Sequence, residues 1–115
     1  MTRRTLLAAL TVCFTLGTKT AEPDPRWIIT PPPAELNLPG FYQKYLSANG
    51  YPIVSSARVN DYALREAAYL VDMMLAKRPD VRRAMIKSGS RMIVIGHNEF
   101  TTDIPEYRHL QPKDY

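Results

Sequence analysis

The sequence predicts a small α+β protein: an incomplete α/β unit with a short parallel core of two strands, near residues 52–56 and 91–96. Both segments are short apolar runs, and two helical patterns lie between them. A strand that returns through helices to a second strand predicts parallel neighbours joined by a crossover. With 115 residues, the chain has room for one small domain.

The segment 40–48 is expected to be a short helix. Asn49 and Gly50 follow it, which is typical of a helix end. Four apolar side chains have helical spacing and would share one face, interpreted as core: Phe41, Tyr42, Tyr45 and Leu46.

The two strands differ in character. Residues 52–56 are short and β-branched, and Pro52 near their start suits the beginning of a strand or an edge. Residues 91–96 contain a continuous apolar run, typical of a strand buried on both faces. Two strands alone do not make a stable sheet, so either further strands lie in the tail or arm, or the chain begins a larger domain.

Two helices are predicted between the strands, at residues 61–77 and 79–88. Asn60 or Asp61 would cap the first helix. Pro79 suits the first position of the second helix, and Gly89 suits the position after its end. The first helix would bury one apolar stripe: Leu64, Ala67, Ala68, Val71, Met74 and Leu75.

Residues 1–20 read as a signal peptide, with Arg3 and Arg4 before an uncharged, mostly apolar stretch that is too short to cross a bilayer. The expected location is therefore secreted or periplasmic, with no membrane span after cleavage. An uncleaved N-terminal anchor and a lipoprotein cysteine at Cys13 are the alternatives. Cys13 is the only cysteine, so the mature chain would have no disulfide, thiolate zinc site or cysteine nucleophile.

Residues 21–39 are expected to form a Pro-rich extended arm, followed by a small α/β domain at 40–115 that is interpreted as a fragment of a larger domain. The arm holds six of the ten prolines. Its apolar residues, Trp27, Ile28 and Ile29, are expected to dock on the body of the domain. The alternative is a Pro-rich ligand in which Trp27 contacts a partner.

The net charge of +4 does not indicate nucleic-acid binding. Three of the fifteen basic residues and none of the eleven acidic residues lie in the first twenty positions. From Ala21 onward the charges nearly balance, whereas binding to phosphates needs clustered lysines and arginines. We therefore expect no nucleic-acid partner.

The tail beyond the second strand carries the remaining candidates for binding a partner: His97, Glu99, Asp103 and His109. The two histidines are twelve residues apart across a proline, which is poor spacing for a metal pair, so no metal site is predicted. Thr101, Thr102 and Asp103 are interpreted as a turn that caps neighbouring amides. Acid-base catalysis by His97, Glu99 and Asp103 is a distant third interpretation, because nothing in the sequence orients them.

Residues 50–107, with the closing segment 112–115, resemble the N-terminal part of larger secreted bacterial proteins that have a zincin-like metallopeptidase fold. In that family, a downstream helix bears a His-Glu-x-x-His zinc motif. This chain has no such motif, so the resemblance carries no catalytic residue or metal ligand onto any position here. Zinc is implied only for the larger family, and no cofactor is expected in this chain.

Two functional hypotheses follow. In the first, the chain is the non-catalytic N-terminal portion of a metallopeptidase-related exported protein, and its partner is the missing C-terminal remainder. This hypothesis predicts an unpaired sheet edge and exposed apolar surface around residues 93–95. In the alternative, the chain is a small, complete secreted module that binds an unknown protein partner through Trp27 and the loop at 97–107. That hypothesis predicts a soluble monomer that unfolds cooperatively.

Overall fold

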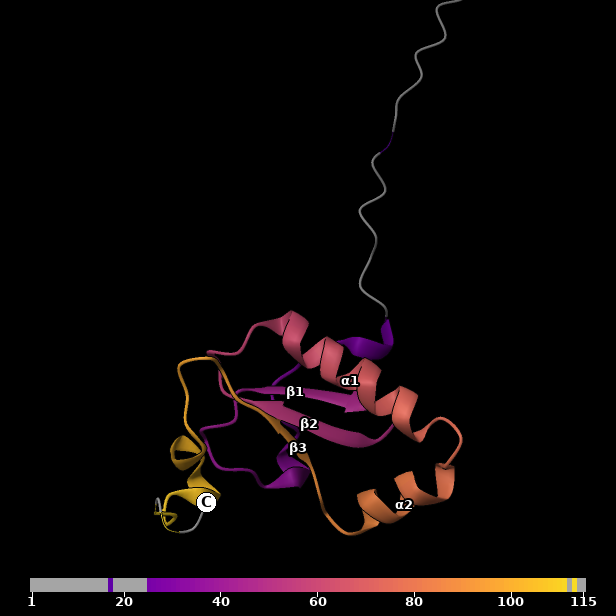
Figure 1. Cartoon of the computed structure of the whole chain (residues 1–115). Coiled ribbons are helices and arrows are strands. Elements are labelled where there is room, and N and C mark those ends of the chain that lie inside the picture. Colours follow the sequence, from indigo (N-terminus) through magenta and orange to yellow (C-terminus); the bar gives the residue numbers. More distant parts are fainter. Residues whose placement is uncertain (1–16, 18–24, 112, 114–115) are drawn as a thin grey trace, which may run out of the picture.

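The structure, a computed structural model, describes residues 17, 25–111 and 113. The expected signal peptide, with Cys13 and all its residues except Gly17, lies outside the described residues. The described chain forms a sheet with one long helix across it and a shorter helix at one end (Figure 1).

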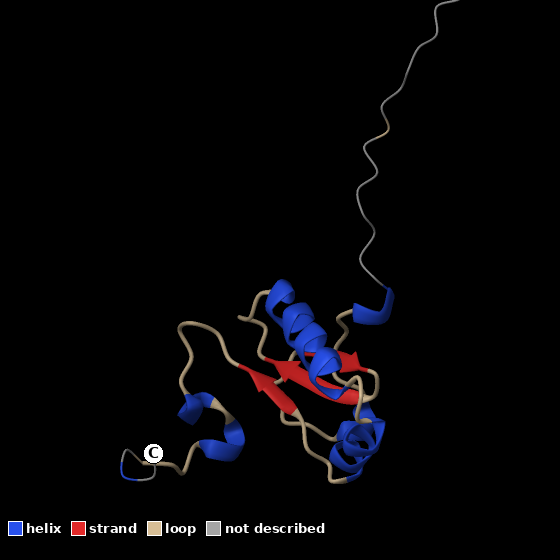
Figure 2. Cartoon of the chain, turned by 45° about the vertical axis from the view of Figure 1, so that its right-hand side comes forward, coloured by secondary structure: helices blue, strands red, loops and turns tan. Residues whose placement is uncertain are grey.

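The sheet has three strands in the order β1-β2-β3. Strand β1 (Lys44–Ala48) is antiparallel to β2 (Tyr51–Ser55), and β3 (Met92–Val94) is parallel to β2. Helices α1 (Asp61–Leu75) and α2 (Pro79–Lys87) connect β2 to β3 (Figure 2). The predicted α+β class, the two helices and the parallel pairing of the two predicted strands are confirmed.

The helix expected at 40–48 is wrong, because residues 44–48 form strand β1. The four apolar side chains do not share a face. Leu46 packs with Ile53 beneath α1, whereas Tyr42 and Tyr45 pack with Val54 on the opposite face of the sheet. The parallel core of two strands therefore has a third, antiparallel strand, which pairs with β2 as the first arm of a hairpin.

Asn49 and Gly50 form the tight turn of the β1–β2 hairpin. Both have positive φ angles, 49° for Asn49 and 93° for Gly50. Asn-Gly is the pair that two-residue hairpin turns favour, because it adopts the left-handed region at low cost. The pair ends an element, as expected, but the element is a strand.

We expect Gly50→Ala to lower the free energy of unfolding by about 1–2 kcal/mol. A Cβ at this φ is strained, and it would lie 3.1 Å from Ile86 Cδ1. Gly40→Ala is the matched control, because a Cβ at Gly40 meets nothing within 4 Å. Urea unfolding of both variants measures the difference; equal stabilities would contradict a strained turn at Gly50.

The Pro-rich arm docks along β1. Thr30 and Tyr45 exchange two backbone hydrogen bonds, of 3.0 and 2.7 Å, at the outer edge of β1. Trp27 and Ile29 pack against the core beside α1, which confirms the expected docking, while Ile28 is exposed. The arm is not wholly extended: it contains two short 3₁₀ helices, η1 (Pro25–Trp27) and η2 (Ala34–Leu36).

Each face of the sheet has its own apolar cluster. The larger cluster lies between the sheet and α1, and the smaller one joins Tyr42 and Val54 to Ile104 of the C-terminal segment. The larger cluster contains eight buried residues: Leu46, Ala48, Tyr51, Ile53, Val59, Leu64, Ala68 and Val71.

Helix α1 begins as the sequence predicts. Asn60 is the N-cap, and its Oδ1 accepts a hydrogen bond of 2.9 Å from the Tyr62 amide. Leu64, Ala68 and Val71 are buried, as expected of the apolar stripe. Met74 was also expected to be buried in this stripe, and that prediction is wrong, because Met74 is 68% exposed. It lies at the margin of the stripe, beyond the width that the small sheet covers.

Helix α2 starts at Pro79, and Gly89 follows its end with a φ of 75°, both as predicted. Burial of residues 91–96 on both faces is not observed: β3 is half-buried and Ile95 is 42% exposed. The reason is that β3 lies at the end of the sheet order. Within the described part of the chain, no helix has the length and hydropathy needed to cross a membrane.

Candidate functional site

The site lies at one end of the sheet, where β2 and β3 end and β1 begins. The carboxyl ends of parallel strands are common positions for ligand sites in α/β sheets. A hollow of about 390 Å³ opens there, a volume within the range of small-ligand sites. Its lining comes from all three strand ends and the C-terminal segment: Phe41, Gln43, Ser56, Ala57, Arg58, Glu99, Asp103 and Arg108.

Glu99 lies at the base of the hollow and is only 7% exposed. Its Oε1 accepts hydrogen bonds from Ser56 Oγ at 3.0 Å and from the Gly96 amide at 2.8 Å. These bonds join the loop after β3 to the loop after β2. No described residue donates a hydrogen bond to Oε2. A buried carboxylate with two donors is a fixed acceptor rather than a solvated surface charge.

Gly96 allows the Glu99 carboxylate to approach the backbone. A Cβ at position 96 would lie 2.9 Å from Glu99 Oε1 and 3.3 Å from Asn98 Oδ1. The Glu99 amide also donates to the Gly96 carbonyl at 3.0 Å, so the loop closes on itself. The absence of a side chain at Gly96 therefore makes room for this turn.

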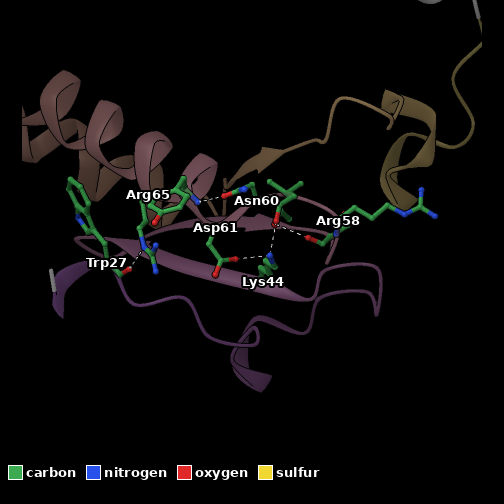
Figure 3. A network of polar contacts seen from close by, with 10 residues as sticks. Trp27, Lys44, Arg58, Asn60, Asp61 and Arg65 are labelled. Atoms are coloured by element: carbon green, nitrogen blue, oxygen red, sulfur yellow. Dashed lines mark hydrogen bonds and ion pairs between the residues drawn. The ribbon is translucent and has the colours of Figure 1, made fainter. Parts of the chain in front are cut away.

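Arg58 and Arg108 carry the positive charge of the hollow, and both are exposed. Neither guanidinium has a hydrogen bond or ion pair with another described residue. Figure 3 shows the Arg58 side chain extending away from the Lys44–Asp61 pair, towards the C-terminal segment. Each guanidinium presents five N–H donors in a planar fork that matches a carboxylate. The hollow therefore has free donors beside a buried acceptor.

Lys44 fixes the loop that carries Arg58. Its Nζ donates to the Val59 carbonyl and to Asp61 Oδ1, both at 2.6 Å (Figure 3). Ser56 Oγ also accepts a hydrogen bond of 3.2 Å from the Arg58 amide. The segment between β2 and α1 is thus held at both ends while the Arg58 side chain remains available.

A second polar cluster holds the C-terminal segment against the sheet. Tyr42 Oη donates to Glu106 Oε2 at 2.6 Å, and Arg91 forms an ion pair with the same carboxylate. The Arg91 guanidinium also lies 5.7 Å from the centre of the Tyr42 ring. Through Glu106, this cluster holds the short 3₁₀ helix η4 (Pro105–Tyr107), which follows η3 (Thr101–Asp103) and precedes Arg108.

Burial and the neighbouring carboxylate shift the pKa values of this cluster. Burial, with the hydrogen bond to Glu106, raises the pKa of Tyr42 to about 12. Burial alone would raise the pKa of Glu106, but hydrogen bonds from Tyr42, its own backbone and Arg91 hold that pKa below its usual value. Tyr42 is therefore a neutral donor, and Glu106 a charged acceptor, throughout the neutral range.

Alkaline pH should weaken the fold through Tyr42. The folded protein holds the phenolic proton more tightly than the unfolded chain, whose tyrosine pKa is about 10. The resulting stabilisation is complete below pH 10 and declines as pH rises from 10 to 12. Urea unfolding should show wild type more stable than Tyr42→Phe at pH 8, and the gap should narrow by about 1 kcal/mol at pH 11. A gap that does not change with pH would contradict this coupling.

The structure brings together only some of the residues that the sequence predicted for the site. Glu99 and Asp103 line the hollow, and Asp103 Oδ2 also accepts a 2.8 Å bond from the Phe100 amide, as the turn interpretation expects. His97 and His109 are exposed and do not line the hollow. Trp27 lies beside α1, with its ring 6.0 Å from that of Tyr69. Within residues 25–111, no group of three or more metal-ligating side chains occurs.

Besides Tyr42, which was expected only in the core, six polar residues of these two clusters were not predicted: Gln43, Ser56, Arg58, Arg91, Glu106 and Arg108. Ser56 is the last residue of the strand predicted at 52–56 and Arg58 lies two positions beyond it, and that position was the available signal. Arg108 and Glu106 gave no such signal, because the fold of the C-terminal segment depends on its contact with Tyr42 and Arg91.

Comparisons with known proteins do not assign this chain to a family. No family model matches the chain. No curated protein and no solved structure matches it either.

Proposed function

We propose that this protein is a small, non-catalytic binding module of an exported protein, and that its hollow binds the carboxyl-terminal end of a peptide. The observation that carries the proposal is that two exposed arginines and a buried, fixed carboxylate line the same hollow. A peptide end offers both matching groups, a carboxylate acceptor and amide donors. The volume of about 390 Å³ suits two or three residues.

Each lining group has a role in this proposal. Arg58 and Arg108 bind the ligand carboxylate, for which paired N–H donors are well suited. Glu99 Oε2 and Asp103 accept hydrogen bonds from the ligand amides. Phe41, which is half-buried at the wall, packs against an apolar side chain of the ligand. Bond cleavage is not proposed, because Ser56 donates to a carboxylate and no described histidine lines the hollow.

Titration calorimetry with the peptide acetyl-Ala-Ala-Phe tests the proposal. The free acid should bind, and its C-terminal amide should bind at least about tenfold more weakly, because the charge-assisted bonds to arginine are lost. The variants Arg58→Gln and Arg108→Gln should each weaken binding of the free acid by about 5–50-fold.

Arg83→Gln is the matched control, since Arg83 is an exposed arginine on α2 that does not line the hollow. It should bind the free acid as wild type does. Equal affinities for the acid and the amide, or equal losses in all three arginine variants, would refute a carboxylate site in this hollow.

The second proposal keeps the sequence resemblance: the chain would be the non-catalytic leading part of a zincin-like, metallopeptidase-related protein. One observation favours it, namely that β3 ends the sheet and Ile95 beside it is exposed. In such a protein, a strand from the remainder would continue the sheet at β3.

A further inference from the structure

Another pocket lies on the face of the sheet that α1 does not cover. Tyr45 of β1 and Pro52 of β2 line it from the sheet, because the alternation of side chains along a strand places both on the face of Val54. Its volume is about 290 Å³, near the lower end of the range for small-ligand sites. It shares no lining residue with the hollow at Glu99, so the two sites are separate.

This pocket has apolar walls from two elements that are far apart in the sequence, η2 of the arm and the end of α2. It is named here the η2–α2 pocket. Leu36 of η2 and Leu38 just after it line the arm side, and Ile86 in the last turn of α2 lines the other side. In Figure 1, α1 lies above the strands, and η2 and α2 lie below them. The pocket therefore offers an apolar body of modest size a surface that is already formed.

The polar groups of the η2–α2 pocket favour a cation. Glu35 on η2 is exposed, and no described residue pairs with its carboxylate or donates a hydrogen bond to it. Ser90 Oγ donates its proton to the Met85 carbonyl at 3.0 Å, so towards a ligand this oxygen acts as an acceptor. Gly89 and Ser90 also follow directly after α2, whose last carbonyl groups form the negative end of the helix dipole.

Among the described residues that line the η2–α2 pocket, none carries an unpaired positive charge. Arg91 lines it, but its guanidinium forms an ion pair with Glu106. Lys87 lies in the last turn of α2 and does not line the pocket. Tyr45 adds a half-buried aromatic ring, and the face of such a ring attracts cations. The free charge of the pocket is therefore the carboxylate of Glu35.

We propose that the η2–α2 pocket binds a small organic amine that carries an apolar body. The ammonium group pairs with the Glu35 carboxylate and donates a hydrogen bond to Ser90 Oγ, beside the end of α2. The apolar body packs between Leu36 and Ile86, against the sheet. An apolar acid is disfavoured at the same place, because its carboxylate would meet that of Glu35. The inference does not depend on the carboxylate site proposed for the hollow.

Amide NMR of the labelled chain with three probes of similar shape tests the proposal: phenethylamine, 2-phenylethanol and 3-phenylpropionate. Titration runs to about 20 mM, because ligands of this size bind weakly. Phenethylamine should shift the amides of residues 35–38, 45 and 86–91, and the neutral alcohol and the acid should each bind at least about threefold more weakly. Equal binding of the amine and the alcohol, or no shift with the amine, would overturn the proposal. So would amine shifts confined to residues 56–58 and 96–99, which would place the cation in the hollow.

Glu35→Gln and Glu66→Gln form a matched pair, because both carboxylates are exposed but Glu66 lies on α1 and does not line the pocket. Glu35→Gln should weaken binding of phenethylamine about 3–10-fold and leave that of 2-phenylethanol within about twofold. Glu66→Gln should leave binding of both probes unchanged. Circular dichroism checks that the two variants keep the fold. Equal effects of the two substitutions, or unchanged amine binding in Glu35→Gln, would overturn the proposal.

Discussion

Leu64→Ala should lower the free energy of unfolding by about 3 kcal/mol. Leu64 is fully buried on α1, in the cluster that joins this helix to the sheet. Alanine removes most of the side chain and leaves a cavity that the short helix and three strands can fill only in part. For a domain of this size, such a loss is a large share of the total stability.

Leu70→Ala is the control for this prediction, since it makes the same substitution on the exposed flank of the same helix. Measured at low micromolar concentration, it should change stability by less than about 0.5 kcal/mol. Urea unfolding followed by circular dichroism gives both values. Similar losses for Leu64→Ala and Leu70→Ala would show that α1 does not pack on the sheet by the face described here.

Glu99→Ala should cost about 2–4 kcal/mol of stability. The substitution removes the acceptor of two bonds and leaves the Ser56 hydroxyl and the Gly96 amide unpaired near the base of the hollow. The loops after β2 and β3 would then lose their connection. Urea unfolding measures the loss, and Glu66→Ala, on the exposed surface of α1, should cost less than about 0.5 kcal/mol.

Glu99→Gln separates the role of Glu99 in holding the two loops together from its proposed role in accepting a hydrogen bond from a ligand amide. Glutamine keeps an oxygen in the place of Oε1, so we expect a cost of only about 1 kcal/mol. Its NH₂ group replaces Oε2, so the acceptor proposed for the ligand amide is lost and peptide binding should weaken. If glutamine proved as destabilising as alanine, the charge of Glu99, and not its hydrogen-bond geometry, would hold the loops.

Local patterns predicted the two helices well. The cap at Asn60, the proline at position 79 and the glycine at position 89 each act within one or two turns of backbone, so their effect can be read from the sequence. The same patterns failed at 40–48. Aromatic residues at helical spacing also fit a strand, and Asn49-Gly50 ends a helix or turns a hairpin equally well. Pairing with residues 51–55 decides between them, and the packing of that hairpin against α1, which is far along the chain, stabilises the strand.

The site was harder to predict than the fold. Glu99 was recognised because it follows a strand, but its partner Ser56 lies 43 positions away. Arg108 joins the hollow only because Glu106 binds Tyr42, a contact that spans 64 positions. Such pairs have no sequence signature in a single chain. His97 was selected for its chemistry, and the structure places it outside the hollow.

The most direct test of the carboxylate site is to map amide NMR shifts while acetyl-Ala-Ala-Phe is added to the labelled protein. We predict that the free acid shifts the amides of residues 56–58, 96–99 and 108, and that the peptide amide leaves them nearly unchanged. Shifts confined to α2, or the same shifts with both peptides, would contradict the proposal that Arg58 and Arg108 bind a ligand carboxylate above Glu99.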